Sequence, residues 1–328
     1  MSFPNISDVL ATTIENRSKK ISDNVMNNNA ILKKLETKGK MKTFSGGHKI
    51  LQELSFAENA NAGWYSGYDL LPVGASDVIS AAEYEIKQAA VPVVISGLEQ
   101  LQNAGKEQMI DLMEARLEVA ETTLSNLIVD GVYSDGMTPT VKQIDGLDAM
   151  ISTTPAVGQY GNIDPASWAF WRNYYDTATT TTTANIQGVW NTAWSNLVRG
   201  QDRPDLIMVD NLEWVKYISS LQLIQRFSSA ETGQLGFSTV KFMDSDVCLD
   251  GGVYFPSAVT GATGASSNQA YFLNCKHLHY RPHAARNMVP LSPNRRYATN
   301  QDAEVQIIAW AGNLTCSARK LQGRVDGS

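Results

Sequence analysis

Residues 105–130 constrain the fold most, because their pattern predicts one long helix. Apolar residues recur at intervals of three and four, the spacing that aligns one face of a helix. That face consists of Met109, Met113, Leu117, Ala120, Leu124, Leu127 and Ile128. Gly131 follows, where we expect a left-handed cap. At about 1.5 Å per residue the helix is roughly 35 Å long, so it needs a broad surface to pack on.

Two long strands are predicted on either side of a large intervening region. Residues 77–96 are rich in β-branched and aromatic side chains, and Pro92 predicts an edge position or a break there. Residues 303–318 have the same character, and we expect them to pair with the first strand. The two strands and the helix then make a flat, elongated platform.

Residues 146–290 predict a separate α+β or α/β lobe. A helix over 185–199 places Ile186, Val189, Trp190, Trp194 and Leu197 on one face. Residues 204–209 read as a buried strand, after which Asp210 or Asn211 caps a second helix. Residues 240–249 and 270–280 are each expected to form one strand, and the threonine-rich stretch 177–183 a loop.

Residues 43–72 predict a β-hairpin that leaves the body. Residues 48–56 alternate in polarity, 57–63 form a flexible tip, and the aromatic stretch 64–70 is expected to return as the second strand. An isolated two-stranded hairpin is marginal in water, and aromatic side chains are enriched at interface hot spots. We therefore expect intersubunit contacts through Ile50, Leu54, Phe56, Trp64, Tyr65 and Tyr68. The alternative is that these side chains pack on the chain's own body.

Residues 1–42 are polar and basic, with short helices predicted over 7–20 and 30–38 and few apolar residues to anchor them. We expect an arm that is ordered by contact with something else. Its net charge is +4, that of residues 281–328 is also +4, and the region between carries −14. Basic ends on an acidic body suit self-association or an acidic partner rather than sequence-specific binding of nucleic acid.

Composition sets further bounds. A chain of 328 residues that is 43 % hydrophobic can form two or three subdomains and bury a large hydrophobic core. No apolar run approaches the roughly 20 residues of a membrane span, so we expect no membrane partner. Cys248, Cys275 and Cys316 are an odd number at wide spacing, which favours free thiols.

The sequence contains no phosphate-cradling loop or nucleophile elbow. On one strand, Cys275, His277 and His279 would share a face that could hold zinc, but a single strand rarely supplies a tetrahedral ligand set. Asp244 and Asp246 suggest an acid pair without a third group to support it. We therefore expect no catalytic residue, no cofactor and no metal, and a protein that is not an enzyme.

This order of elements resembles the major capsid protein of tailed bacteriophages, the Hong Kong 97-type coat fold. The likeness lies in the extended loop over 44–71, the strand and helix over 77–96 and 105–130, the entry to the lobe at 146–151, and the returning strand over 304–317. The resemblance implies an α+β fold in four parts. These are an N-terminal arm (1–42), an extended hairpin loop (43–72), a peripheral domain (73–145 and 291–328, with a spine helix over 105–130) and an axial domain (146–290).

The resemblance further implies a structural protein that self-assembles as pentamers and hexamers into an icosahedral head around double-stranded DNA, without sequence-specific binding. Its partners would be identical subunits, a portal and, since the arm is short, a separate scaffolding protein; the family also admits a decoration protein. The location would be the virion, assembled in the host bacterial cytoplasm. Two alternatives are the shell of an encapsulin-like cellular compartment and a metal-dependent enzyme that uses Cys275, His277 and His279.

Overall fold

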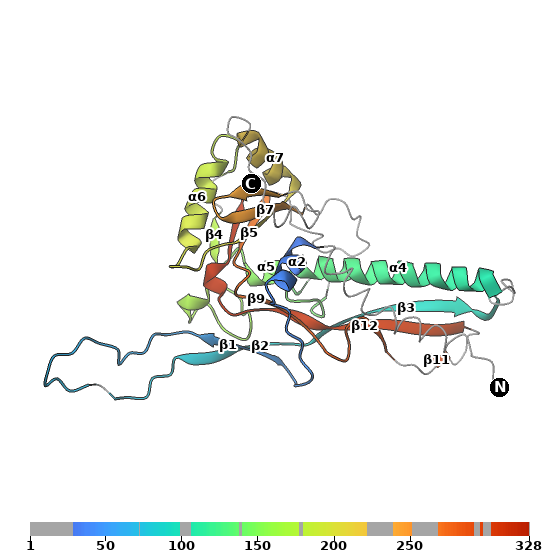
Figure 1. The fold of residues 1–328 in the computed structure, drawn as a ribbon, viewed down its shortest axis with the longest axis horizontal. Helices are drawn as coiled ribbons and strands as arrows, with labels where there is room; N and C mark the ends of the chain where they lie inside the picture. Colours follow the sequence, from blue (N-terminus) through green and yellow to red (C-terminus); the bar gives the residue numbers. More distant parts are fainter. Residues whose placement is uncertain are drawn as a thin grey trace.

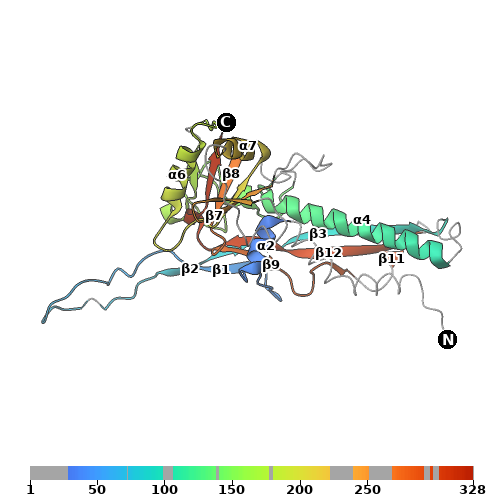
Figure 2. The same ribbon diagram turned by 45° about the horizontal axis from the view of Figure 1, so that its top comes forward.

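The computed structural model describes residues 29–71, 73–98, 106–137, 140–176, 180–221, 239–250, 268–291, 296–297 and 303–327. They form an elongated platform, a lobe that stands on one part of it, and a hairpin that projects beyond the lobe (Figure 1). A view turned by 45° shows that platform and hairpin are both narrow, and that the lobe rises from the junction between them (Figure 2).

The predicted long helix is α4, Lys106–Tyr133. Its apolar face packs as expected where side chains are described, because Leu117, Ala120, Leu124 and Ile128 are all buried. The side chains of Met109 and Met113 lie outside the described residues. The predicted cap at Gly131 is wrong, since the helix continues through this position to Tyr133. A Cβ at Gly131 would lie 2.9 Å from Ile144 Cδ1, so the glycine serves a close approach rather than a turn.

The platform sheet is built on β12, Ala303–Cys316. It pairs antiparallel with β3, Lys87–Ser96, from Ala303↔Ser96 to Gly312↔Lys87, which confirms the predicted pairing of the two long strands. β9 (Leu278–Pro282), β10 (Val289–Pro290) and β11 (Arg296–Tyr297) line the other side of β12. Within the described part of the chain β3 pairs only with β12, so Pro92 lies on an edge strand as expected.

The lobe contains a six-stranded sheet and two helices, α6 (Ile186–Leu197) and α7 (Asn211–Ser220). Its strand order is β4 (Tyr174–Asp176), β13 (Gly323–Asp326), β8 (Gln269–Leu273), β5 (Leu206–Val209), β7 (Ser245–Leu249) and β6 (Thr239–Phe242). Asp210 caps α7 as predicted, accepting the amide of Glu213 at 2.9 Å. One face of the sheet packs under both helices in a core around Trp190, and the other joins the main core.

Two strand predictions for this region are wrong. Residues 240–249 form a hairpin, β6 and β7, because Met243 adopts a positive φ of 50° at the turn. Residues 270–280 divide between β8 in the lobe and β9 in the platform, with a turn at 274–277. The C-terminal strand β13 was not predicted; it pairs with β8 and β4 in the lobe, although its residues belong to the stretch 291–328 expected in the peripheral domain. Each segment has the local character of a strand, but the identity of its neighbour is a long-range property.

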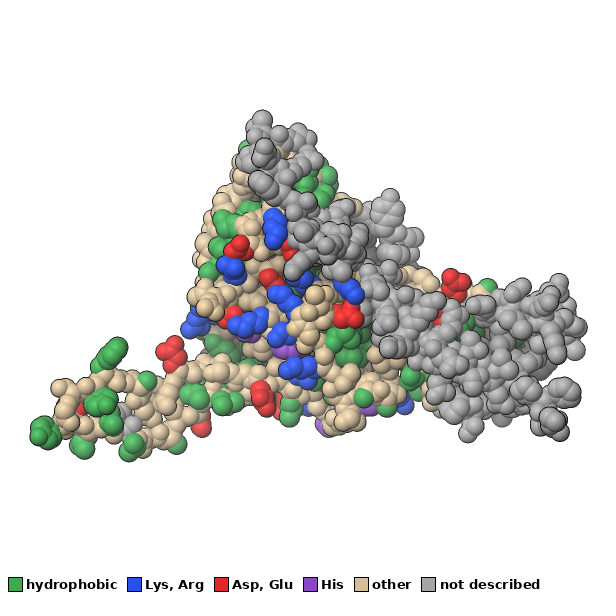
Figure 3. Space-filling model, viewed as in Figure 1, with side chains coloured by type: hydrophobic (Ala, Val, Ile, Leu, Met, Phe, Trp, Pro, Cys, Tyr) green, Lys and Arg blue, Asp and Glu red, His purple; other side chains and the backbone are tan. Residues whose placement is uncertain are grey.

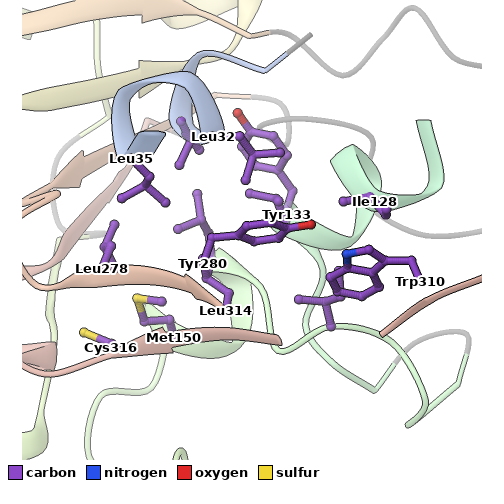
Figure 4. Close-up of a cluster of buried hydrophobic side chains, with 14 of the residues drawn as sticks. Leu32, Leu35, Ile128, Tyr133, Met150, Leu278, Tyr280, Trp310, Leu314 and Cys316 are labelled. Atoms are coloured by element: carbon purple, nitrogen blue, oxygen red, sulfur yellow. The ribbon is translucent and has the colours of Figure 1, made fainter. Parts of the chain in front are cut away.

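Helix α2, Ala30–Thr37, corrects the prediction of a free arm. Ile31, Leu32 and Leu35 are fully buried in the main core. Leu32 and Leu35 lie on the side of the helix that faces Tyr280 and Leu278 (Figure 4). Lys34 Nζ lies 2.6 Å from Asp246 Oδ2 of the lobe, in a buried ion pair. Three well-spaced apolar side chains are thus enough to anchor this helix. The predicted helix over 7–20 lies outside the described residues.

Short elements complete the description: α5 (Leu147–Met150) and the 3-10 turns η1 (Ala169–Trp171) and η3 (Arg319–Leu321). The three cysteines are free and buried, as expected. None of the described helices combines the length and apolar character needed to cross a bilayer.

Candidate intersubunit surface

The projecting hairpin begins as a regular two-stranded ribbon. β1 (Ile50–Ser55) and β2 (Ile79–Tyr84) pair antiparallel from Ile50↔Tyr84 to Ser55↔Ile79, and the amide of Phe56 extends the ladder to the carbonyl of Val78 at 3.1 Å. The return strand predicted over 64–70 is therefore wrong, since the chain returns as β2. The excursion between the strands covers residues 57–77, and we call this segment the projecting loop.

The base of the hairpin packs on its own chain. Ile50 and Leu54 lie at alternate positions of β1, are only 4 % and 5 % exposed, and belong to the main core. Phe56 is partly buried, with its ring 5.7 Å from that of Trp168 and 5.9 Å from that of Phe170. The predicted role of Ile50 and Leu54 in intersubunit contacts is wrong, because their burial leaves them no surface to offer. The alternation predicted for this strand is confirmed.

The base is also fixed by polar contacts to the platform. Gln52, buried between Ile50 and Leu54, accepts a hydrogen bond from Arg281 Nη2 at 2.8 Å. Tyr84 Oη donates to the carbonyl of Cys316 at 3.0 Å, and burial raises the pKa of this phenol well above its usual value. The hydroxyl therefore stays protonated and remains a donor. The ribbon cannot shift along the platform without losing this hydrogen bond.

The projecting loop is shaped by a few hydrogen bonds of its own. The amide of Ala62 donates to the carbonyl of Asn59 at 3.1 Å, and the amide of Asp69 to that of Ser66 at 2.9 Å. Asn61 Nδ2 donates to the carbonyl of Gly74 at 2.6 Å and ties the two limbs together. The loop thus holds an extended shape without a regular ladder.

Apolar side chains on the loop face solvent. Of the predicted contact residues, Trp64 and Tyr68 are fully exposed and Tyr65 is 68 % exposed. Sequence reasoning missed Leu70, Leu71 and Val73, which are also exposed; the apolar run directly after the aromatics was the available signal. Figure 3 shows hydrophobic side chains standing on this loop, away from the body of the subunit. Since burial of one such side chain is worth roughly 1.5–3 kcal/mol, their joint burial amounts to on the order of 10 kcal/mol.

A surface of matching chemistry lies at the other end of the molecule. A groove of about 360 Å³ runs between β3 and α4 and is lined mainly by small apolar side chains. Val94 on the strand is 44 % exposed and Val119 on the helix 66 %. Such an exposed apolar pair on a rigid frame is suited to packing against another protein surface.

The structure does not assemble the suggested zinc site. Cys275 and His277 lie in the turn after β8, whereas His279 lies on β9, so the expected single strand is absent. Burial raises the pKa of the Cys275 thiol to about 11, and His277 Nδ1 is 3.0 Å from Ser317 Oγ. No group of three potential metal-ligating side chains occurs among the described residues.

The two aspartates suggested as an acid pair are engaged elsewhere. Asp246 pairs with Lys34 and Asp244 with Arg203, at 2.6 and 2.7 Å. They come from a strand and its preceding turn, and each binds a cation from a different part of the chain. The ion pairs of these two aspartates therefore have a structural role, and the aspartates do not form an acid pair with each other.

Comparisons with known proteins identify the architecture. No family model and no curated protein sequence matches the chain. Among solved structures, the cyanophage A-1(L) capsid asymmetric unit superposes with a TM-score of 0.63 at 14 % identity, covering 88 % of this chain and 90 % of the other. This is the fold of phage capsid subunits. The expected α+β fold of the Hong Kong 97 type is thereby confirmed.

Two further structures carry the same capsid fold. The capsid of a native GTA particle has a TM-score of 0.55 at 10 % identity and 89 % coverage of both chains. Mycobacterium phage Ogopogo has a TM-score of 0.52 at 12 % identity, covering 89 % of this chain and 90 % of the other. These matches extend over about nine-tenths of this chain, so the likeness is not confined to one part of the molecule.

Proposed function

We propose that this chain is the major capsid protein of a tailed double-stranded DNA bacteriophage, and that it assembles as pentamers and hexamers into the icosahedral head that encloses the genome. One observation carries the proposal: a chain with the capsid fold presents Trp64, Tyr65 and Tyr68 to solvent on a loop that its own body does not cover. Side chains of this size are exposed together where a partner buries them. In the proposed shell the partner is an identical subunit.

Each part of the molecule has its own role in this proposal. Residues 1–42 would serve as an arm that α2 anchors on the subunit's own body. Residues 43–72 would be the extended loop, 73–145 with 291–328 the peripheral domain, and 146–290 the axial domain. β9 and β13 are shared across these boundaries, since each pairs with strands of the other part. The projecting loop would lie over the neighbouring subunit's platform.

The remaining partners belong to the same proposal. A separate scaffolding protein and a portal would take part in assembly, in the host bacterial cytoplasm, and a decoration protein would find room on the outer surface. DNA would be enclosed without sequence-specific binding, because the net charge of −6 opposes general adhesion to it. The role is structural and requires no catalytic residue.

Expression of the chain, alone and with the adjacent genes of its genome, tests this proposal. We expect sedimentation and negative-stain microscopy to show capsomers or closed shells. A protein that stays monomeric under all of these conditions would exclude the proposal. Shells that protect a protein cargo instead of DNA would point to a cellular compartment of the encapsulin kind.

A further inference from the structure

A short open sheet edge lies beside β9. Residues 40–44 run parallel to this strand, with bridges at Met41↔Tyr280 and Phe44↔His283. The amide of Lys42 donates to the carbonyl of Tyr280 at 3.1 Å, and the amide of Tyr280 to the carbonyl of Lys40 at 3.2 Å. By alternation the backbone groups of Met41 and Thr43 point away from β9. In the described part of the chain no other backbone group pairs with them, so the edge can accept one more strand.

Basic side chains flank this edge. Met41 and Tyr280 pack on the main core, which places Lys40, Lys42, His279 and Arg281 on the opposite side by alternation. Neither lysine forms an ion pair with any described residue. We call these four residues the basic edge. In Figure 3 lysine and arginine side chains, interspersed with acidic ones, gather over the middle of the molecule, where α2 and β9 lie in Figure 1.

Two nitrogen atoms of the basic edge are buried without a hydrogen-bond partner. His279 is 5 % exposed, and its Nδ1 atom contacts no donor or acceptor. Arg281 binds Gln52 through Nη2, but its Nε atom is likewise unpartnered. Buried polar atoms of this kind are rarely left unsatisfied in a functioning assembly. Both atoms lie below the surface of the subunit, so an incoming group would meet Lys40, Lys42 and the outer atoms of Arg281 first.

The local electrostatics select an anion. The pKa of His279 is lowered to about 4, first by burial and then by the positive charges of Lys40, Arg281 and Lys42. No carboxylate is among the largest causes of this shift. A carboxylate brought to this face would therefore meet uncompensated positive charge at short range.

The projecting loop has the complementary character. Residues 57–77 contain Glu58, Asp69 and Asp77 and no lysine or arginine. The loop is extended, without a regular ladder, and points away from the basic edge of its own chain in both views (Figures 1 and 2). Glu58 lies 3.9 Å from Arg199 of its own lobe, with both side chains exposed. Among the described residues Asp69 and Asp77 have no such ion pair, so these carboxylates can reach a basic edge only on another molecule.

We propose that the basic edge receives the acidic projecting loop of a second copy of this chain, which adds an extended segment to residues 40–44 and places its carboxylates against Lys40, Lys42 and Arg281. The inference rests on the proposed self-assembly and names the surface that recognises the loop. The open edge favours a polypeptide over nucleic acid, because only a polypeptide supplies the amides and carbonyls that complete a sheet. Specificity would come from the charge pairs, which repel a wrongly placed basic segment.

Charge reversal tests the proposal. One chain carries Lys40→Glu and Lys42→Glu, a second carries Glu58→Lys and Asp77→Lys, and a third carries all four substitutions. Lys142→Glu with Lys320→Glu is the matched control, since both of these lysines are exposed and lie outside the basic edge. Assembly is measured by sedimentation velocity and microscopy, and folding by circular dichroism and the melting temperature.

We expect each double variant to raise the concentration needed for assembly at least tenfold, the fourfold variant to return within about threefold of the wild type, and the control to stay within twofold. Normal assembly of the Lys40/Lys42 variant, or a fourfold variant no better than its parents, would overturn the proposal. If the two glutamates unfold the subunit, the double variant Lys40→Gln with Lys42→Gln replaces them. Normal assembly of that variant would also overturn the proposal.

Two other outcomes have separate meanings. A Lys40/Lys42 variant that assembles normally but no longer retains a double-stranded DNA fragment in filter binding would assign the basic edge to nucleic acid, and the present proposal would be wrong. Failure of the wild-type chain to assemble under any condition would reject the proposed function itself. The two proposals therefore fail in different experiments.

Discussion

The platform and the projecting loop are both long and narrow, but they treat apolar side chains in opposite ways. On the platform, Leu117 and Leu124 of α4 are buried against the sheet of β3 and β12. On the loop, Trp64 and Tyr68 are fully exposed. The platform buries these side chains within one subunit, whereas the loop leaves its rings uncovered. Substitutions in the platform should therefore act on folding, and substitutions in the loop on association.

The largest effect is expected from Leu117→Asp, which places a charge in the buried face of α4. An unpaired buried carboxylate costs about 4 kcal/mol or more, so the subunit should become insoluble or unfold at ordinary temperature. Val119→Asp on the same helix is the matched control, because Val119 is 66 % exposed. Solubility and thermal melting measure the difference. A soluble, native-like Leu117→Asp variant would show that this face of α4 does not pack against the platform sheet.

Replacement of residues 57–77 by an Asn-Gly turn should have the converse effect. The ladder between Phe56 and Val78 is retained, and a two-residue turn suits a hairpin of this kind. We expect a monomer with an unchanged melting temperature that forms no stable shells in sedimentation. Shells of normal yield would contradict the role given to the loop, and a large loss of thermal stability would show that the loop supports its own subunit.

Single aromatic substitutions should sharpen this result. Trp64→Ala and Tyr68→Ala each remove a fully exposed ring, so the free energy of unfolding should change by less than about 0.5 kcal/mol. If the rings are hot spots, assembly should weaken by about 2 kcal/mol each, roughly thirtyfold. Trp64→Phe keeps most of the apolar area and serves as the conservative control. Unchanged assembly of both alanine variants would remove these rings from the interface.

The smallest effect is a pH dependence within the platform. Burial raises the pKa of Asp130, in the last turn of α4, to about 6. The charged form is therefore disfavoured in the folded state, so this group lowers stability above pH 6 and the penalty disappears as the pH falls below about 4. Asp130→Asn should raise the melting temperature by roughly 1–2 °C at pH 7 and leave it unchanged at pH 4.

Asp77→Asn on the projecting loop is the control for this pH dependence. It is exposed, so the melting temperature should not change at either pH. A gain from Asp130→Asn that is equal at pH 4 and pH 7 would show that ionisation of Asp130 is not its cause. A gain from both substitutions would show that the effect is one of net charge.

The regular parts of the platform could be predicted because their signal is local. The three- and four-residue spacing of α4 assigns its buried face, and two matched apolar strands leave few choices of partner. The hairpin base was predicted for the same reason, since Ile50, Gln52 and Leu54 alternate with exposed residues. The exposed aromatics Trp64, Tyr65 and Tyr68 were identified as contact residues from their composition, and that role stays a prediction.

The errors concern partners that are distant in the chain. Residues 270–280 look like one strand, yet β8 pairs with β5 and β13 while β9 pairs with β12. α2 was expected to be loose, but it fills the angle between lobe and platform, a site that exists only after β9 and β7 have met. The basic edge was missed because Lys40 and Arg281 lie 241 positions apart in the sequence.

The sequence by itself determined which segments are helical or extended, which faces are apolar, and that the hairpin carries more apolar surface than its neighbours along the chain can cover. Tertiary structure alone decided which strands share a sheet, which contact residues are buried at the base and which remain exposed, and that Lys40, Lys42, His279 and Arg281 meet beside an open edge. The physical reason is that periodicity and capping act over a few residues, whereas pairing, burial and electrostatic fields depend on groups that only the folded chain brings together.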